Sequence, residues 1–289
     1  MRIANNDGRI ALVQGELLLD VERASEGVFS SDPMAAFARW DELVAWAGTV
    51  DVAAHPDSSA LAEAALDAPS PRPRQVFGIG LNYADHAAES GLPLPENPLV
   101  FTKFSSSVAG PDVEVPLAGD TVDWEAELVV IIARGGRHIP LAEARSHVAG
   151  FTAGQDLSER TVQWQGQPAQ FSMGKSFENF APIGPVVVTL DEFADPDRLR
   201  LTTTIVGVDG TSTEVQNGST DQLIFGVDDL ISRLSETIEL LPGDLIFTGT
   251  PPGVGAGREP KWFLVAGDRL VTQIEGIGRI TQRFIGDPR

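Results

Sequence analysis

Short strand-like runs separated by glycine and proline dominate this chain of 289 residues. Its 29 glycines and 20 prolines exceed the usual combined share of about 12%, and both residue types interrupt long helices. Runs rich in branched and aromatic side chains cover residues 76–79, 99–104, 124–133, 147–155, 183–190, 201–208, 244–247 and 269–274. Helical patterns are few, at 83–90, 141–146 and 227–235. Because strands and helices do not alternate regularly, we expect a β-rich α+β fold rather than a doubly wound parallel sheet.

The first seventy residues have a different pattern. Residues 9–21 predict two short strands, residues 32–47 a helix with Asp32 as its cap, and residues 59–66 a second small helix. Three prolines between residues 68 and 74 indicate a stiff linker, because proline fits neither a helix interior nor a central strand. We therefore expect a small N-terminal α/β domain at 1–70 and a larger domain at 71–289.

The charge balance narrows the class of partner. The chain carries 41 acidic and 21 basic residues, for a net charge of −20. This balance argues against binding to nucleic acid or to anionic lipid, both of which require a basic surface. The absence of cysteine excludes disulfides and thiolate metal ligands. With no signal-peptide pattern and no apolar run of membrane-spanning length, we expect a soluble, cytoplasmic protein that acts on a small molecule.

Two glutamates precede the most apolar run of the chain. Glu125 and Glu127 are two residues apart, so in a strand they project to the same side. Buried together they would repel each other and lose solvation, and a divalent cation is the simplest compensation. Asp156 ends another apolar run and could be a third ligand. Three carboxylates favour Mg²⁺ or Mn²⁺ over Zn²⁺. The alternatives are a solvated strand end for the glutamates and a helix cap for Asp156.

Two further motifs carry groups suited to catalysis. His86 and Glu89 are three apart in a helical pattern, where the carboxylate can orient the imidazole as a general base for water. A surface His–Glu pair is the alternative. Lys175 lies in a Gly-Lys-Ser triplet, but Ala169 occupies the position where a phosphate-binding loop needs glycine. Lys175 could instead be a partly buried cation facing an anionic substrate, or a solvated lysine.

Five motifs follow one another between about residues 78 and 285: Gly80-Leu81-Asn82-Tyr83 with His86 and Glu89, Trp124-Glu125-Ala126-Glu127, Gln155-Asp156 with Arg160 and Gln163, Gly174-Lys175-Ser176-Phe177, and Thr248-Gly249-Thr250-Pro251. Their order and spacing resemble the fumarylacetoacetate hydrolase family. No fourth carboxylate accompanies the motif of Glu125 and Glu127, so the resemblance is to the smaller, acylpyruvase-like bacterial branch. It implies a roll of mixed β-sheets, a homodimer, and a Mg²⁺ or Mn²⁺ site made by Glu125, Glu127 and Asp156.

The resemblance also implies an activity. The expected reaction is metal-dependent hydrolysis of a C–C bond in an acylpyruvate-type 2,4-dioxo acid, which gives pyruvate or a related 2-oxo acid and a carboxylic acid. The implied catalytic residues are His86, Glu89 and Lys175, and the implied substrate-binding residues are Tyr83, Arg160, Gln163 and Thr250. Oxaloacetate decarboxylation and isomerisation with decarboxylation of 2-hydroxyhepta-2,4-diene-1,7-dioate are alternatives on the same fold. A non-catalytic, acidic metal- or ligand-binding β protein is the alternative from another class.

Overall fold

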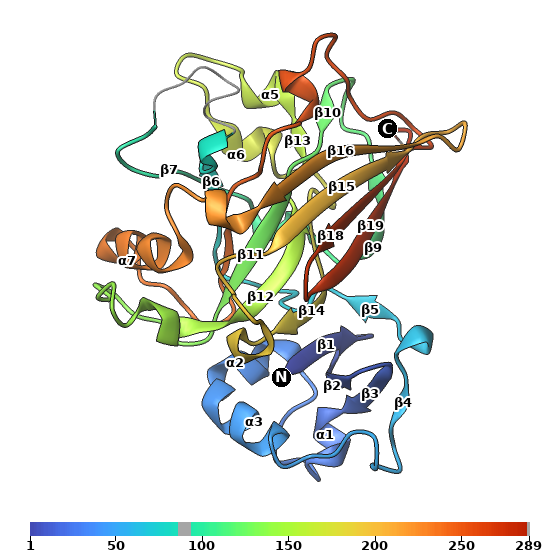
Figure 1. The fold of residues 1–289 in the computed structure, drawn as a ribbon, viewed down its shortest axis with the longest axis vertical. Helices are drawn as coiled ribbons and strands as arrows, with labels where there is room; N and C mark the ends of the chain where they lie inside the picture. Colours follow the sequence, from blue (N-terminus) through green and yellow to red (C-terminus); the bar gives the residue numbers. More distant parts are fainter. Residues whose placement is uncertain (86–93, 288–289) are drawn as a thin grey trace.

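The computed structural model describes residues 1–85 and 94–287 of the chain. His86, Glu89 and most of the helix expected over 83–90 therefore lie outside the described residues. Within those ranges the chain forms three sheets and a few short helices (Figure 1). The strand-rich α+β fold predicted from the sequence is confirmed.

The largest sheet has twelve strands in the order β4-β3-β2-β1-β14-β12-β11-β17-β6-β7, with β5 paired to β1 and β8 paired to β14. It is mixed, because β6 runs parallel to β17 while most neighbours are antiparallel. Its strands are β1 (Arg2–Asn6), β2 (Arg9–Gln14), β3 (Leu17–Asp20), β4 (Ser59–Ala60), β5 (Leu66–Asp67), β6 (Val76–Gly80), β7 (Leu99–Thr102), β8 (Val108–Ala109), β11 (Ala126–Ile132), β12 (Val148–Gln155), β14 (Ala181–Val188) and β17 (Leu245–Phe247).

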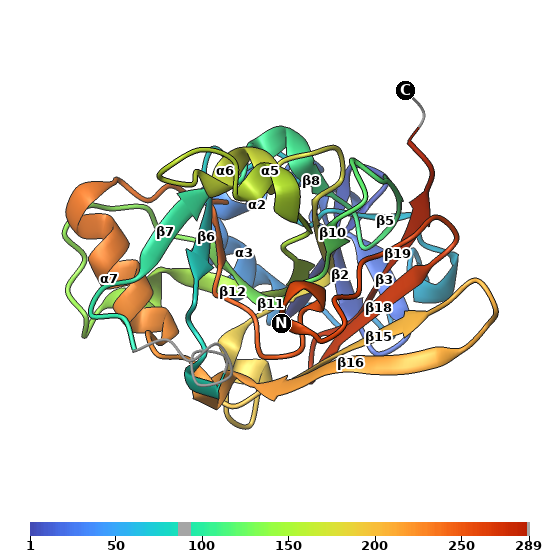
Figure 2. The ribbon, with the colours of Figure 1, turned by 90° about the horizontal axis from the view of Figure 1, so that it is seen from above.

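The other two sheets are smaller. A five-stranded sheet has the order β16-β15-β18-β19-β9, and β10 pairs with β13. Figures 1 and 2 show the five-stranded sheet beside β11 and β12. These strands are β9 (Asp112–Pro116), β10 (Val122–Asp123), β13 (Ser158–Glu159), β15 (Arg200–Val206), β16 (Ser212–Ser219), β18 (Arg269–Ile274) and β19 (Gly278–Ile285). The α-helices are α1 (Val21–Ala24), α2 (Pro33–Ala38), α3 (Trp40–Ala47), α5 (Arg160–Gln163), α6 (Phe171–Gly174) and α7 (Val227–Thr237). Among the described residues, no helix has the length and apolar character needed to cross a bilayer.

Strand β11 is apolar throughout because both of its faces are covered. Leu128, Val130 and Ile132 belong to a core cluster that includes side chains of α7 and of the five-stranded sheet. The alternating residues Val129 and Ile131 belong to a second cluster, which includes side chains of α2 and α3. A strand buried on both faces reads as a continuous apolar run, as this one does.

The N-terminal strands extend the large sheet. Strand β1 pairs with β14, with Ile3 opposite Val187. Phe37 and Trp40, from α2 and α3, share a core cluster with Phe247 of β17. The domain boundary predicted near residue 70 is thus crossed by a continuous sheet and by a shared apolar cluster.

Three predicted helices take other forms. Residues 32–47 form α2 and α3 instead of one helix, because Arg39 leaves helical geometry at φ −127° and ψ 35°. Residues 59–66 form a strand and a 3₁₀ turn (Leu61–Glu63), because β4 and β5 pair with β3 and β1. Residues 141–146 contain only a 3₁₀ turn (Ala144–His147). The remaining 3₁₀ turns are Ser105–Ser107, Leu190–Glu192, Thr220–Gln222 and Gly255–Gly257.

Candidate active site

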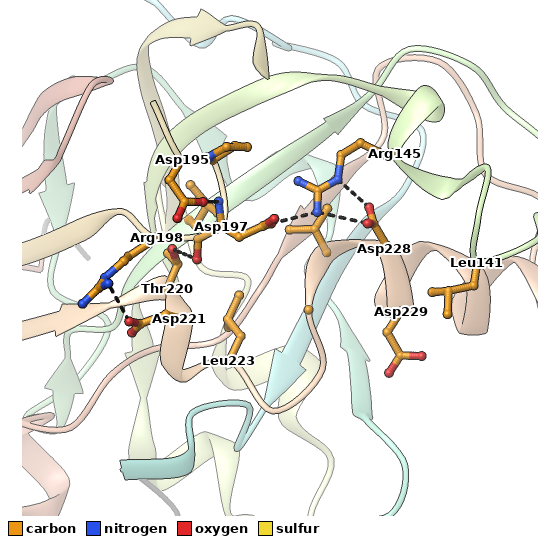
Figure 3. Close-up of a pocket in the computed structure, with 14 residues that line it drawn as sticks. Leu141, Arg145, Asp195, Asp197, Arg198, Thr220, Asp221, Leu223, Asp228 and Asp229 are labelled. Carbon is orange, nitrogen blue, oxygen red and sulfur yellow. Dashed lines mark hydrogen bonds and ion pairs between the residues drawn. The ribbon is translucent and has the colours of Figure 1, made fainter. Parts of the chain in front are cut away.

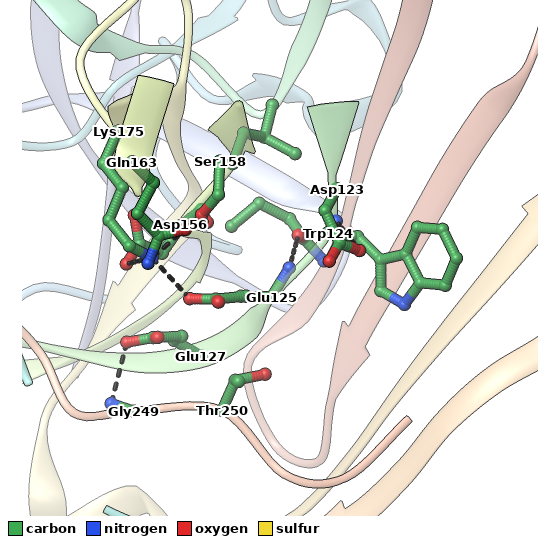
Figure 4. Close-up of polar contacts among 12 residues, drawn as sticks. Asp123, Trp124, Glu125, Glu127, Asp156, Ser158, Gln163, Lys175, Gly249 and Thr250 are labelled. Carbon is green, nitrogen blue, oxygen red and sulfur yellow. Dashed lines mark hydrogen bonds and ion pairs between the residues drawn. The ribbon is translucent and has the colours of Figure 1, made fainter. Parts of the chain in front are cut away.

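The antiparallel pairing of β11 and β12 brings three carboxylates together. Glu125 precedes β11 and Glu127 lies in it, while Asp156 follows the last residue of β12. The register places Ala126 opposite Gln155, so the start of one strand meets the end of the other. One oxygen from each of the three carboxylates lies within 4.8 Å of the others. Figure 4 shows the three side chains pointing toward one another.

Three cations surround two of these carboxylates. Lys175 Nζ lies 2.7 Å from Glu125 Oε2 and 2.7 Å from Asp156 Oδ2. Lys103 Nζ lies 2.5 Å from Asp156 Oδ1, and Arg160 Nη1 lies 2.7 Å from Glu125 Oε1. In contrast, the Glu127 carboxylate accepts a hydrogen bond from the backbone N–H of Gly249 at 2.8 Å and has no cationic partner among the described residues.

This unequal pairing sets the charge state of the two glutamates. Burial alone would raise the pKa of Glu125, but Lys175 and Arg160 hold it at about 2. Burial, together with repulsion from Asp156 and Glu125, raises the pKa of Glu127 well above its usual range. The cluster therefore lacks positive charge on the Glu127 side. Three converging carboxylate oxygens with this deficit fit a hard divalent cation such as Mg²⁺ or Mn²⁺.

Two glycines allow the close approaches that build the site. A Cβ on Gly174 would lie 2.5 Å from the backbone nitrogen of Gln163, so glycine lets α6 pack against α5 and places Lys175 beside the carboxylates. Gly249 has φ +103°, a backbone conformation that favours glycine, and this turn aims its N–H at Glu127. The glycine of the Gly-Lys-Ser triplet thus serves packing and not phosphate binding.

A cavity of about 480 Å³ opens onto this cluster. Arg160 and Gln163 are three apart on α5 and both line it, with Arg160 Nη1 donating to Gln163 Oε1 at 2.9 Å. Thr250 also lines the cavity, and its hydroxyl accepts a hydrogen bond from Gln216 at 2.8 Å. The wall includes three aromatic rings in contact. The ring centroid of Phe171 lies 5.8 Å from that of Phe101 and 5.0 Å from that of Trp164. The cavity thus joins a charged end to an apolar wall.

The structure does not bring every predicted site residue to this cavity. Tyr83 is fully buried in the core cluster that also contains Leu128, and it is not among the described residues that line the cavity. Its hydroxyl has no hydrogen-bond partner in the described part of the chain. His86 and Glu89 lie outside the described residues. The site therefore contains Glu125, Glu127, Asp156, Lys175, Arg160, Gln163 and Thr250 of the predicted set.

Two functional residues were missing from the sequence prediction. Lys103 is buried behind Asp156 and also donates to the backbone carbonyl of Lys175. Asp123 is buried and binds Arg160 through Nη2 at 2.7 Å. A signal for Lys103 existed, because the chain has only three lysines and all three lie in or beside this site.

A second cavity, of about 550 Å³, lies near α7 and is lined by five aspartates and two arginines (Figure 3). Arg145 binds Asp228 at 2.7 Å and Asp197 at 2.8 Å, while Arg198 lies 3.3 Å from Asp221. Asp197, Asp221 and Asp228 are thus paired with arginines. Among the described residues, only Glu125, Glu127 and Asp156 form an acidic group whose ligand atoms converge.

Comparison with known proteins gives consistent matches. The family profile described as fumarylacetoacetate (FAA) hydrolase C-terminal matches residues 75–285. Human mitochondrial oxaloacetate tautomerase FAHD2A is 42% identical over 220 residues, which cover 75% of this chain and 68% of that protein.

Solved structures match over almost the whole chain. A Mycobacterium smegmatis protein provisionally called HpcE is 52% identical, with a TM-score of 0.91 and 99% of each chain covered. Maleylpyruvate hydrolase from Sphingobium sp. SYK-6, in complex with manganese(II) ion and pyruvate, is 26% identical, with a TM-score of 0.80 over 99% of this chain and 100% of that one.

Proposed function

The chain belongs to the fumarylacetoacetate hydrolase family, and we propose that it hydrolyses a C–C bond in an acylpyruvate-type 2,4-dioxo acid with the help of a divalent cation. Members of this family are enzymes that include hydrolases, isomerases and decarboxylases. The observation that carries the proposal is the buried triad of Glu125, Glu127 and Asp156 at the end of a cavity that also presents Lys175 and Arg160. A 2-oxo acid offers the oxygens that such a centre binds.

The metal would be Mg²⁺ or Mn²⁺, held by the three carboxylates. When bound, it would supply a Lewis acid for the carboxylate and 2-oxo oxygens of the substrate. Both ions accept all-oxygen ligand sets. Manganese in the related maleylpyruvate hydrolase supports this choice, and that structure also contains pyruvate.

The cations of the site would stabilise negative charge on the substrate. Burial alone would lower the pKa of Lys175, but Asp156 and Glu125 raise it above its ordinary value, so Lys175 stays protonated at neutral pH. It is therefore suited to electrostatic stabilisation and not to proton abstraction. Arg160 is held by two carboxylates in the same way, and together with Gln163 and Thr250 it would orient the substrate in the cavity.

Activation of water is assigned to His86. It lies outside the described residues, and the sequence motif with Glu89 supports the role, because a carboxylate three residues away on a helix can orient the imidazole. Water activated in this way would attack the distal carbonyl of the substrate. The products would be pyruvate, or a related 2-oxo acid, and a carboxylic acid.

A second candidate function is the keto–enol tautomerisation of oxaloacetate. It is favoured by the human relative of that name, which is 42% identical over 75% of this chain. This reaction exchanges protons next to the 2-oxo group and needs no nucleophilic water. The triad, Lys175 and Arg160 would serve it equally well, so the two candidates differ chiefly in their need for His86.

The test is a turnover assay with metal-free protein to which Mg²⁺ or Mn²⁺ is added. Acetylpyruvate should release pyruvate only in the presence of metal. Glu127→Gln should lower kcat/KM by at least about 100-fold, because a metal ligand is lost. Unchanged turnover of this variant, or turnover in EDTA, would overturn the proposal. If acetylpyruvate is inert and His86→Ala keeps metal-dependent oxaloacetate tautomerisation, the second candidate holds instead.

A further inference from the structure

One cation of the cavity has no carboxylate partner. Arg160 and Lys175 are both paired with buried carboxylates. Lys261 is exposed, lines the same cavity, and has no ion pair within the described part of the chain. The neighbouring Arg258 is not among the described residues that line the cavity. Its guanidinium donates to the backbone carbonyls of Val215 and Gly253 at 2.7 and 3.0 Å.

The backbone on both sides of Lys261 is fixed. The N–H groups of Gly255 and Ala256 donate to the carboxylate of Asp123 at 2.7 and 2.9 Å. Trp262, which follows Lys261, donates its N–H to the carbonyl of Gly255 at 3.2 Å. Its ring packs edge-on against Trp124, with 5.6 Å between the ring centroids. The loop that carries Lys261 is therefore anchored beside the metal centre, although the lysine side chain itself reaches solvent.

The charge balance of the carboxylate cluster suggests a role for Lys261. Four buried or largely buried carboxylates face three buried or largely buried cations. A bound divalent ion would leave one net positive charge, which matches one carboxylate of a 2-oxo acid. A second carboxylate at the far end of the substrate would find no unpaired positive charge at the centre. The groups counted are Asp123, Glu125, Glu127 and Asp156, and Lys103, Arg160 and Lys175.

We propose that Lys261 is a specificity-determining residue that pairs with the distal carboxylate of a dicarboxylic 2-oxo acid. The preferred substrates would then have an acyl tail that ends in a carboxylate instead of a methyl group. The apolar wall at Phe101 and Phe171 would contact the carbon chain between the two charged ends. This inference rests on the proposed function, because the metal centre must hold the 2-oxo end of the ligand.

Calorimetric binding to the metal-loaded protein tests the proposal with matched ligands. The probes are 2-oxoglutarate against 2-oxopentanoate, and 2-oxoadipate against 2-oxohexanoate, since each pair differs only in a terminal carboxylate or methyl group. The wild-type protein should prefer the diacid of at least one pair by about three- to tenfold, the range of an ion pair at a cavity mouth. Added salt should reduce that preference.

Variants assign the preference to Lys261. Lys261→Gln should abolish it while leaving the affinity for the monoacid unchanged, and Lys261→Arg should retain most of it. Arg23→Gln removes one positive charge from an exposed residue of α1 and should change neither affinity, which controls for net charge. Because Lys261 is exposed, these substitutions should leave the melting temperature unchanged.

The outcomes separate the two proposals. If both monoacids and diacids bind in a metal-dependent manner but with equal affinity, or if Lys261→Gln keeps the preference, the role of Lys261 is overturned and the proposed function stands. If no 2-oxo acid binds in a metal-dependent manner, the proposed function fails and the role of Lys261 fails with it.

Discussion

The carboxylate of Asp123 binds the guanidinium of Arg160 through two nitrogens, at 2.8 Å from Nε and 2.7 Å from Nη2. The same carboxylate accepts the N–H groups of Gly255 and Ala256. A single buried side chain thus fixes the cation beside Glu125 and the loop that leads to Lys261. Asp123 is a positioning residue, because it acts through these groups and does not line the cavity.

Asp123→Asn should therefore affect both stability and function. Asparagine has the size of aspartate but lacks the negative charge that pairs with Arg160. Its NH₂ group would also face backbone N–H groups, which are donors themselves. We expect a loss of about 2–4 kcal/mol in the free energy of unfolding and a lower kcat/KM, measured by urea denaturation and steady-state kinetics. Asp112→Asn is the control, because Asp112 pairs with Arg283 at an exposed position and should cost at most about 1 kcal/mol. Equal effects of the two variants would contradict the positioning role.

A second prediction concerns Lys103. Its side chain is fully buried and pairs with Asp156, so Lys103→Met leaves part of that carboxylate without a countercharge. The metal-free protein should lose about 3–5 kcal/mol of stability. Mg²⁺ should then raise the melting temperature of the variant more than that of the wild type, because the added cation replaces the missing charge.

Thermal unfolding in EDTA and in excess Mg²⁺ measures this effect. Lys261→Met is the matched control, since it makes the same chemical change at an exposed position and should leave both melting temperatures near those of the wild type. If Mg²⁺ shifted Lys103→Met no more than the wild type, Lys103 would not contribute to the charge of the metal centre.

The sequence predicted the carboxylate triad because its members follow local rules. Alternation along one strand places Glu125 and Glu127 on one side, and an apolar run that ends at Asp156 indicates a buried neighbour. Asp123 and Lys103 could not be found in this way. Lys103 follows the edge strand β7 and meets Asp156, 53 residues along the chain, only through the tertiary fold. Pairing between distant segments is not encoded in local pattern.

The same limit explains the errors in the N-terminal region. Residues 59–66 have helical composition, but their backbone pairs with β1 and β3, and these tertiary hydrogen bonds prevail over a weak local preference. Strand β1 was not predicted at all. Its sequence RIANN ends in two asparagines, and it is a strand because it lies between β2 and β14.

A third prediction concerns pH. Burial raises the pKa of Asp244 from 3.8 to about 6, although the carboxylate accepts N–H groups of Gln75 and Leu241. The folded protein therefore binds this proton more tightly than the unfolded chain. The stabilisation from Asp244 is complete only below the unfolded-state pKa of 3.8, and it is lost as the pH rises through about 6.

Asp244→Asn removes this titration, and any constant cost of the amide is the same at every pH. The free energy of unfolding of the wild type, relative to the variant, should fall by about 1–3 kcal/mol between pH 4 and pH 7. Urea denaturation of both proteins in EDTA across this range measures the difference. Parallel curves would show that Asp244 titrates normally in the folded protein.

The last prediction concerns the turn that carries the Lys261 loop. A Cβ on Gly255 would lie 1.8 Å from the carbonyl oxygen of Trp262 and 2.8 Å from Asp123 Oδ1, so Gly255→Ala must push the loop away from both. We expect a loss of about 1–3 kcal/mol of stability and a weaker preference for 2-oxoglutarate over 2-oxopentanoate. Gly257→Ala, two residues on, would meet only Val254 Cγ2 at 3.7 Å, an ordinary contact, and should keep the wild-type melting temperature. If the two variants melted alike, the contact between Gly255 and Trp262 would not hold the loop in place.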